Sequence, residues 1–469
     1  MTRVKTRTVV ILVAIALMAQ LRPALAENGT LVISNATLID GTGAKERPKV
    51  TILVRDGLIV RVVDAGEAVI PDGTHIVDAT GKFVIPGLAN MHVHYGTGGL
   101  VPFDSHTVDR TLRQFLFYGV TTIFNLGATG GSLEDVLHLR ALQREGRLVG
   151  PHIYATGGLL TVPGSHPIAT IMHLPEGADA KTYDWSKRGV WVVRTPEDVR
   201  RIVERLAAAG MDGIKIVIES GPGIFGDNHP QMPPALVAAS VDEATRHGLS
   251  VFAHATSIDE LEEALASHVR GVMHIVDDPG PPSDKLLEVM AEQGTYYVPT
   301  LSAFIWTSTW GPPSQVLTDP FLKSGVEARV IKSLVESPLA PTGPPSDKEW
   351  AWRRGMLQAL EKAHAAGVRI AGGSDTANPF VFPGYSMHEE LALMVEAGLT
   401  PMEALVSATR RAAEMLHAED TFGTVEPGKR ADLLILGSDP LKDIRNTRTL
   451  EAVIQNGRII DRSSLLAHD

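Results

Sequence analysis

Four histidines and one aspartate stand at the ends of short apolar runs in this sequence of 469 residues. His92 and His94 end GLANMHVH, His254 and His274 lie in VFAHA and GVMHI, and Asp375 ends IAGGSD. Side chains two positions apart on a strand point to one face, so the first two imidazoles can hold the same metal ion. A lone His-x-His also fits two surface histidines, a single buried histidine often belongs to the core, and the aspartate could cap a helix. Because all five recur at strand ends, we predict that they bind metal.

Lys215 lies inside another apolar run, GIKIVIE, where Ile214, Ile216 and Ile218 share the opposite strand face. A buried ammonium loses its hydration, and burial lowers the pKa of the amine until it is neutral and nucleophilic. A neutral amine can react with CO2 to form a carbamate, whose carboxylate can bridge two metal ions. A lysine that forms a Schiff base and a lysine that extends its charge to solvent are the alternatives. We favour the carbamate because the other candidate ligands converge on the same site.

The elements that position these residues are short apolar runs that alternate with helical stretches. The apolar runs cover 87–94, 119–127, 151–158, 213–219, 250–255, 271–277, 294–302 and 368–375. Helices fit between them, for example over 195–210, 234–248 and 258–268, and Ser283 and Ser346 of the repeated pentapeptide PPSDK should cap two more. Eight strand–helix units predict an α/β fold with a closed (β/α)8 TIM barrel, whose active site forms at the C-terminal ends of the strands. Closure would place the last strand, with Asp375, beside the first.

Sequence typical of β-strands flanks this region on both sides. Residues 27–86 contain alternating apolar runs separated by turns such as Asp56-Gly57, and the pattern returns from residue 420 with the turn Asn456-Gly457. Asp-Gly and Asn-Gly between such runs are hairpin signals. We predict one β-sandwich domain made from residues 27–86 and 420–469, with the barrel over 87–419 inserted between its two parts.

The first 26 residues have the features of a secretory signal peptide. A basic segment at 3–7 precedes the apolar stretch 9–19, and the small-residue site Ala24-Leu25-Ala26 follows. The alternative is a membrane anchor, but the apolar stretch is too short to span a bilayer. We therefore predict cleavage after Ala26, a periplasmic or secreted protein, and no membrane association of the mature chain.

Composition excludes several kinds of function. The formal net charge is −11, so we do not expect the chain to bind nucleic acid. The chain has no cysteine, which excludes disulfides, thiolate metal ligands and cysteine nucleophiles. A homo-oligomeric assembly is compatible with these properties.

Together the motifs resemble the amidohydrolase superfamily. The resemblance rests on PGLANMHVH, GIKIVIES, FAHATS, VMHIVDD, IAGGSD and EPGKRADLLIL, and it covers essentially the whole chain after residue 26. It looks closest to the branch that holds metal-dependent prolidases, other Xaa-dipeptidases and imidazolonepropionases. Relatives of this type often have Thr-Gly-Gly-His after the third strand. Here Leu159 takes the place of that histidine, and Asn125 stands where a charged residue is expected.

The resemblance implies a centre of two divalent metal ions, and zinc suits its ligands. By position, His92, His94 and Asp375 would bind the more buried ion, His254 and His274 would bind the second, and a carboxylated Lys215 (N6-carboxylysine) would bridge both. The carbamate would derive from CO2.

Such a centre implies hydrolysis of a carbon–nitrogen bond in a small molecule. A hydroxide that bridges the two ions would attack a carbonyl carbon, and Asp375 would accept the water proton and deliver it to the leaving nitrogen. The expected substrate is a dipeptide or an N-acyl amino acid. A lactone, ester or organophosphate hydrolase could use the same centre, and a Schiff-base lyase and a binding protein without catalysis are further alternatives.

Two long connections that follow strands are expected to hold the substrate. One covers 159–194 and contains His166, and the other covers 303–347 and contains Trp306. Tyr385 follows the last strand, among other aromatic residues. We predict that these three side chains contact the substrate, while packing in the core is the alternative for the aromatic ones.

Overall fold

The structure is a computed structural model of the chain, and it describes residues 29–70, 73–94, 105–127, 131–172, 174, 177–179, 182–221, 228–278, 280–308, 314–337, 345–376 and 378–466. For residues 105–106, 306–308 and 314–315 it describes the backbone alone. The predicted signal peptide, residues 1–26, lies outside the described residues. Within the described ranges, no helix is long and apolar enough to cross a bilayer.

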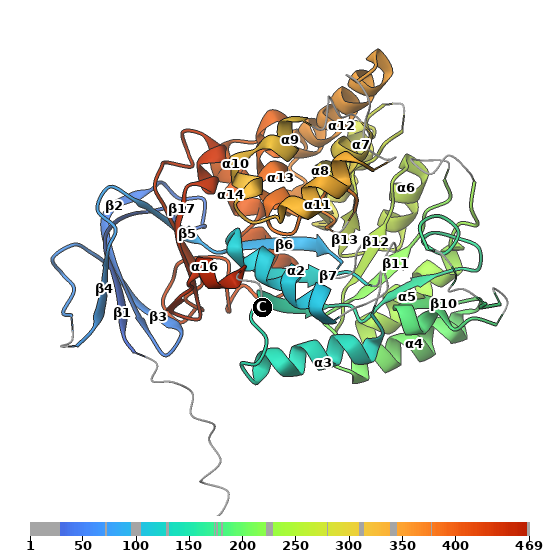
Figure 1. Ribbon diagram of the computed structural model, residues 1–469. Helices are drawn as coiled ribbons and strands as arrows, with labels where there is room; N and C mark the ends of the chain where they lie inside the picture. Colours follow the sequence, from blue (N-terminus) through green and yellow to red (C-terminus); the bar gives the residue numbers. More distant parts are fainter. Residues whose placement is uncertain are drawn as a thin grey trace, which may run out of the picture.

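Strands from the two ends of the chain share one eight-stranded mixed sheet, which lies at one side of the molecule (Figure 1). Its order is β18-β17-β16-β5-β1-β2-β3, with β4 paired to β1. The strands are β1 (Leu31–Leu38), β2 (Arg47–Arg55), β3 (Leu58–Asp64), β4 (His75–Asp78), β5 (Phe83–Pro86), β16 (Leu433–Leu436), β17 (Leu450–Gln455) and β18 (Arg458–Ile459). The turns Asp56-Gly57 and Asn456-Gly457 have positive φ at both residues, as type I′ hairpins require. Both predicted hairpins therefore form, between β2 and β3 and between β17 and β18.

This sheet buries an apolar cluster that draws on both ends of the chain. Ile33 and Ile52 come from the N-terminal strands and Leu433 from a C-terminal one, and all three are buried. At the β3 edge, the N–H of Ile59 donates to the carbonyl of Lys429 (2.9 Å), just before β16. Shared burial of apolar surface thus holds the two ends together in a β-rich domain. Its division into two facing sheets and the predicted domain boundaries stay predictions.

Parallel strands carry the rest of the fold, and each of the eight apolar runs expected from the sequence contains one. A three-stranded sheet has the order β6 (Leu88–Val93), β7 (Val120–Asn125), β8 (His152–Ala155). A seven-stranded sheet has the order β10 (Val190–Val192), β9 (Leu159–Thr161), β11 (Ile214–Val217), β12 (Val251–His254), β13 (Gly271–Met273), β14 (Tyr296–Val298), β15 (Arg369–Ile370). β9 and β10 belong to the long connection after β8.

Hydrogen bonds bring the first and last parallel segments together. The N–H of Met91 donates to the carbonyl of Gly372, and the N–H of Asp375 donates to the carbonyl of His92, both at 2.9 Å. Next to them, residues 93 and 376 form a parallel bridge. At the other junction, β8 pairs with β7, and β9, which closely follows it, pairs with β11. Asp375 therefore lies beside His92, which is the neighbour relation that the sequence predicted.

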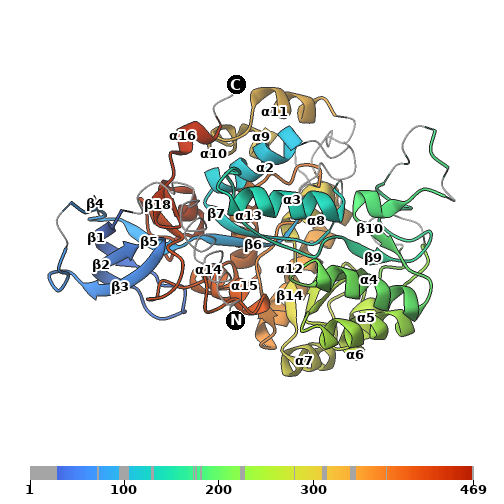
Figure 2. The same cartoon turned by 90° about the horizontal axis from the view of Figure 1, so that it is seen from below.

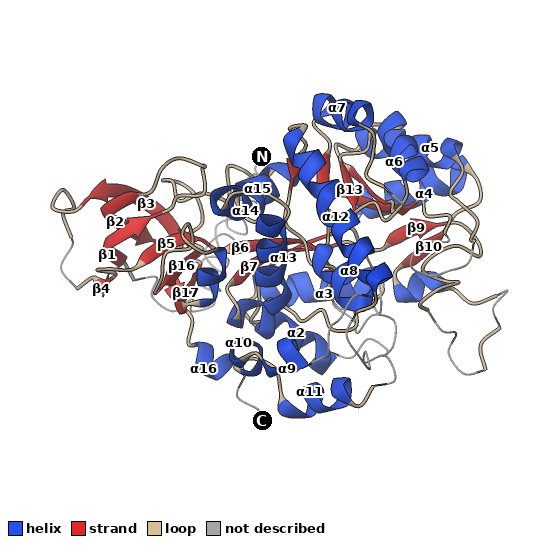
Figure 3. Cartoon of the chain, turned by 90° about the horizontal axis from the view of Figure 1, so that it is seen from above, coloured by secondary structure: helices blue, strands red, loops and turns tan. Residues whose placement is uncertain are grey.

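Helices surround the parallel strands (Figures 2 and 3). They are α2 (Ser105–Phe117), α3 (Leu133–Arg144), α4 (Pro196–Ala208), α5 (Pro234–Arg246), α6 (Ile258–Ala266), α7 (Asp284–Gln293), α8 (Leu301–Ser308), α9 (Ser314–Thr318), α10 (Pro320–Lys323), α11 (Ala328–Val335), α12 (Asp347–Ala365), α13 (Tyr385–Glu396), α14 (Pro401–Ser407), α15 (Arg410–Met415) and α16 (Arg462–Leu465), with 3-10 turns η1 (Trp185–Arg188) and η2 (Ile444–Arg448). Ser283 and Ser346 accept hydrogen bonds from backbone N–H groups of α7 and α12, so both predicted caps are confirmed.

Alternation along β11 sends its side chains to two environments. Ile214 and Ile216 belong to the apolar cluster that also contains Leu206 of α4 and Val237 of α5. Because successive side chains on a strand point to opposite faces, Lys215 points away from these helices. The sheet therefore directs this lysine toward the interior of the parallel strands.

Candidate metal centre

The six predicted ligands lie at or near the C-terminal ends of parallel strands. His92 belongs to β6, Lys215 to β11 and His254 to β12, while His94, His274 and Asp375 follow β6, β13 and β15. Five of them are buried, and His94 is partly buried. Parallel pairing gathers side chains that are far apart in the sequence at one end of the strands.

Three of these residues meet around one carboxylate. Oδ1 of Asp375 lies 3.3 Å from Nε2 of His92 and 3.1 Å from Nε2 of His94, yet no donor among the described residues is aligned for a hydrogen bond to it. His274 approaches the other oxygen, with 3.8 Å between its Nδ1 and Oδ2. Donor atoms of His92, His274 and Asp375 all lie within 4.8 Å of one another. This spacing suits ligands around a single cation.

Outer contacts orient two of the imidazoles. Nδ1 of His94 lies 2.7 Å from the carbonyl oxygen of Gly127, which can only accept, so Nδ1 carries the proton and Nε2 keeps its lone pair. Nδ1 of His274 contacts the hydroxyl of Thr300 at 2.9 Å. Metal-binding histidines usually make such a contact through the nitrogen that does not bind the ion.

The backbone at two ligand positions lies in the left-handed region, with φ of 82° at His274 and 56° at Asp375. Residues other than glycine adopt this conformation at a cost, so the surrounding structure must hold it. Asn90 helps to hold the backbone next to Asp375. Its amide donates to Oγ of Ser374 (2.7 Å), and its Oδ1 accepts from the N–H groups of His92 and Ser374. The sequence analysis did not single out Asn90, because an asparagine in a strand carries no pattern of its own.

Burial sets the charge of the imidazoles. It holds the pKa of His92 and His274 well below the usual range and lowers the pKa of His254 to about 3. These rings are therefore neutral at pH 7 and can offer a lone pair. Burial alone would raise the pKa of Asp375, but the neighbouring imidazoles and Lys215 hold it below its usual range. Neutral imidazoles around an ionised carboxylate are the state that divalent metals require of their ligands.

Lys215 is buried, with 1% of its surface exposed. Burial lowers the pKa of its amine to about 7, although the charge of Asp375 opposes this. Its own charge acts on both His92 and His254, and its Nζ has no hydrogen-bond partner among the described residues. A partly neutral amine without a partner meets the chemical requirement for carbamate formation.

A second close group contains Glu219, which the sequence analysis did not single out. Its Oε2 lies 2.8 Å from Nε2 of His254 and 3.6 Å from Nδ1 of His166. Donor atoms of these three buried residues lie within 4.8 Å of one another. The sequence could have indicated Glu219 as a site residue. It lies four positions after Lys215 in GIKIVIE, and alternation predicts that both side chains point to one side. The structure thus brings His166 to the site.

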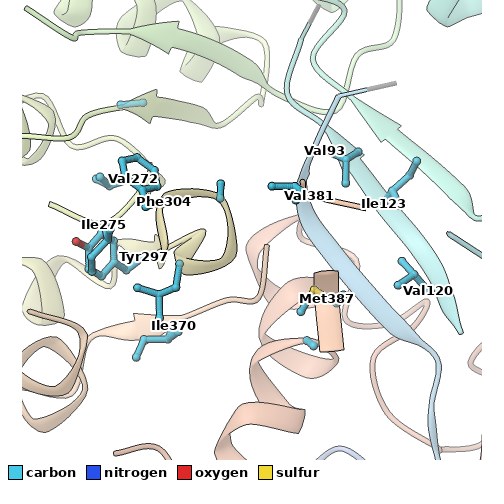
Figure 4. Packing of buried hydrophobic residues seen from close by; sticks show 14 of the residues in the cluster. Val93, Val120, Ile123, Val272, Ile275, Tyr297, Phe304, Ile370, Val381 and Met387 are labelled. Carbon is cyan, nitrogen blue, oxygen red and sulfur yellow. The ribbon is translucent and has the colours of Figure 1, made fainter. Parts of the chain in front are cut away.

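His274 stands between the two groups. Its ring centroid lies 4.6 Å from that of His92 and 4.3 Å from that of His254, so its assignment to one ion stays a prediction. Phe304 of α8 packs against it, with 5.5 Å between the ring centroids. Figure 4 shows Phe304 near Val272 in the apolar cluster.

The other two predicted substrate contacts lie elsewhere. Trp306 belongs to α8, and its side chain lies outside the described parts of the structure. Tyr385 begins α13 as a buried residue, donates its hydroxyl to Oδ2 of Asp319 (2.8 Å) and packs against Tyr118. The structure does not bring Tyr385 into either metal group, and its role in substrate binding stays a prediction.

Comparison with known proteins identifies the family. The sequence profile of the amidohydrolase family matches residues 83–460. The chain belongs to the amidohydrolase family. It is similar to ochratoxinase of Aspergillus niger, with 27% identity over 454 aligned residues that cover 90% of this chain and 84% of the relative.

Two solved structures resemble this amidohydrolase over nearly their whole length. A Xaa-Pro dipeptidase with methionine bound in its active site has 25% identity and a TM-score of 0.71, over 92% of this chain and all of the other. A protein of Bifidobacterium longum assigned as a prolidase has 29% identity and a TM-score of 0.71, over 94% of this chain and 99% of the other. The predicted superfamily and branch are confirmed. This amidohydrolase is an enzyme, a hydrolase that acts on carbon–nitrogen bonds.

Proposed function

We propose that this chain hydrolyses an amide bond of a dipeptide or an N-acyl amino acid at a centre of two divalent metal ions. The observation that carries the proposal is the convergence of buried, neutral imidazoles and Asp375 around Lys215. Buried polar atoms normally find partners. Here Nζ of Lys215 and Oδ1 of Asp375 have no aligned partner among the described residues. Bound ions would be the partners of Oδ1 and of the carboxylate that Nζ would carry as a carbamate.

The strand arrangement supports a closed (β/α)8 barrel. Backbone hydrogen bonds link 91–94 to 372–376 at one junction, and β8 and β9 follow each other closely at the other. We infer that the two parallel sheets form one barrel. Closure would direct every ligand toward the interior at the C-terminal end of the strands.

Two ligand sets fit the donors that are present. The sets we propose are His92, His94 and Asp375 for one ion and His254 and His274 for the other, with the carbamate of Lys215 between them. To form the carbamate, Nζ bonds to the carbon of CO2 and releases one proton, which leaves an N-linked carboxylate. We propose zinc as the ion, because it accepts both imidazole nitrogen and carboxylate oxygen.

The chain's own contribution to the reaction is to hold and move one proton. When bound, the ions would supply hydroxide at neutral pH and polarise the carbonyl group of the substrate. Asp375 is ionised, so it can accept the proton of the attacking water and return it to the leaving nitrogen. Asn378 steadies this carboxylate, because its Nδ2–H donates to Oδ2 at 2.7 Å.

The relatives support the proposed substrate class. Structures described as a Xaa-Pro dipeptidase and a prolidase support a dipeptide or a related N-acyl amino acid. The long connections after β8 and β14 would form the walls of the substrate site. His166, Trp306 and Tyr385 remain the predicted contacts within or near them.

A substrate panel tests this function. The zinc-loaded protein is assayed with dipeptides that include Xaa-Pro, N-acyl amino acids, lactones, esters and an organophosphate triester. We expect cleavage of amides with a kcat/KM that exceeds the others by about 100-fold or more, and loss of activity with a chelator. A preference for the lactone, the ester or the triester would overturn the substrate assignment, and activity that resists chelation would overturn the metal centre.

We also propose that the protein is exported to the periplasm or beyond the cell, with removal of residues 1–26. The support is the basic, apolar and small-residue order of that segment. N-terminal sequencing of protein from the periplasmic fraction should begin at Glu27, and a cytoplasmic chain that keeps Met1 would contradict export. Light scattering on the same material would decide whether the chain forms a homo-oligomer.

A further inference from the structure

Glu219 has no role in the two ligand sets described above. It lies two residues after the end of β11 at Val217 and is 1% exposed. Alternation along an extended chain predicts that it points to the same side as Lys215. Neither of its carboxylate oxygens has an aligned hydrogen-bond donor among the described residues. An ionised carboxylate in such a place is costly unless a cation neutralises it. The position therefore calls for a positive charge.

Two imidazoles face this carboxylate. Nε2 of His254 lies 2.8 Å from Oε2 of Glu219, a distance at which a hydrogen bond would form if the groups were aligned, but they are not. His166 stacks beside His254, with 4.7 Å between the ring centroids. Two donor atoms that each lie about 2.1 Å from one tetrahedral ion are about 3.4 Å apart. The two contacts of Oε2 of Glu219, 2.8 Å to His254 and 3.6 Å to His166, lie on either side of this spacing.

The buried carboxylate of Glu260 fixes the positions of Glu219 and His254, although it is not one of the three clustered donors. Glu260 accepts hydrogen bonds from the N–H of Ser220 (2.7 Å) and the N–H of Thr256 (2.8 Å). Ser220 directly follows Glu219, and Thr256 lies two residues after His254. The ends of β11 and β12 are thereby kept at a constant distance, which preorganises the two donors.

We propose that Glu219 and His166 are additional protein ligands of the divalent ion that His254 holds. This inference rests on the metal centre proposed above and adds two ligands, one at the end of β11 and one in the long connection after β8. Together with His254, His274 and the carbamate of Lys215, these two residues would give the ion three imidazoles and two carboxylate groups, and a six-coordinate ion would keep one position for water or substrate. Because three of the five donors are imidazoles, the set favours an ion such as Zn2+ over Ca2+ or Mg2+.

Metal affinity distinguishes ligands from residues that only orient His254. Glu219→Gln keeps an oxygen that can accept a proton from His254 but removes the charge, and His166→Ala leaves the contact between Glu219 and His254 intact. Chelator-treated protein is titrated with Zn2+ and with Co2+ against a chelating dye, and the visible spectrum of the Co2+ form is recorded. We expect two ions in the unchanged protein. Each variant should weaken one of them by about 100-fold or more and alter the Co2+ spectrum, while the other ion stays bound.

Glu243→Gln is a matched control, because Glu243 of α5 contacts His247 at 3.1 Å outside the site. Its metal affinity should equal that of the unchanged protein. If both site variants bind two ions with unchanged affinity, Glu219 and His166 are not ligands, even where amide hydrolysis persists. If the unchanged protein binds no ion, the proposed function fails as well. Should Glu219→Gln not fold, as judged by circular dichroism, His166→Ala decides alone: a lost ion supports the proposal and unchanged affinity contradicts it.

Discussion

Nε2 of His92 lies 3.3 Å from Oδ1 of Asp375, although the two residues come from the first and last parallel segments of the chain. The backbones of the two residues are also in contact, because the N–H of Asp375 donates to the carbonyl of His92 at 2.9 Å. The position of the carboxylate thus depends on pairing between β6 and the segment after β15. A substitution at either residue should therefore alter the position of the other.

Replacing Asp375 by asparagine should separate catalysis from metal binding. Asparagine has nearly the same shape and tolerates the left-handed backbone at this position (φ 56°), so the variant should fold. Its amide cannot hold the transferred proton, and we expect kcat to fall by about 100-fold or more. Amide cleavage and metal content are measured on the same sample. Full turnover with both ions bound would show that the proposed proton role is wrong.

Replacing Lys215 by alanine should lower the metal content of the purified protein below two ions per chain, because the bridging carboxylate is lost. Elemental analysis measures the content. In protein prepared with 13C-bicarbonate, NMR should show a carbamate carbon that the variant lacks. Lys362→Ala is the control, since Lys362 lies at the surface in a contact with Asp284 (3.1 Å). An unchanged stoichiometry in Lys215→Ala would contradict the bridging role.

Gly373→Ala should disturb the site through packing alone. A Cβ at Gly373 would lie 2.5 Å from Cγ1 of Val298 and 3.0 Å from the Cβ of His92. We expect the free energy of unfolding to fall by about 1–3 kcal/mol and metal affinity to fall with it, as measured by urea unfolding and metal titration. Gly355→Ala in α12 is the matched control, because nothing lies within 4 Å of its Cβ. Equal stability of the two variants would mean that β6 and β14 adjust without cost.

Asp277→Asn should change how stability depends on pH. Burial raises the pKa of Asp277 to about 7, and the charge of Asp278 adds to the effect. The unfolded chain ionises this carboxyl near pH 4, so the unchanged protein loses stability as the pH rises from about 4 to about 7. Asparagine stays neutral. In urea unfolding of metal-free protein, the free energy of unfolding of the variant relative to the unchanged protein should rise by about 2 kcal/mol between pH 5 and pH 8. An advantage that is the same at both pH values would contradict the raised pKa.

Much of the local structure could be predicted because it depends on neighbours in the sequence. Type I′ turns need positive φ, which Asp56-Gly57 and Asn456-Gly457 adopt readily, and the caps Ser283 and Ser346 act on N–H groups only three residues ahead. Each of the eight apolar runs contains a strand, as predicted. Alternation along β11 was enough to direct Lys215 away from the helices.

The partners of these residues could not be read from local pattern, because they depend on which strand ends meet. Leu159 takes the place expected for a histidine and packs in an apolar cluster, while His166, further along the same connection, returns to the site beside His254. Glu219 and Asn90 look like isolated polar residues in apolar runs until the neighbouring strands are placed.

The sequence by itself determined the family, the strands that carry the candidate ligands and the types of donor available for chemistry. Only the tertiary structure decided that Glu219 lies 2.8 Å from His254 and that Tyr385 turns its hydroxyl to Asp319 inside the protein. The physical reason is that periodicity decides which face of an element a side chain occupies. Contact between distant residues instead arises from strand pairing and burial, which the whole chain settles together.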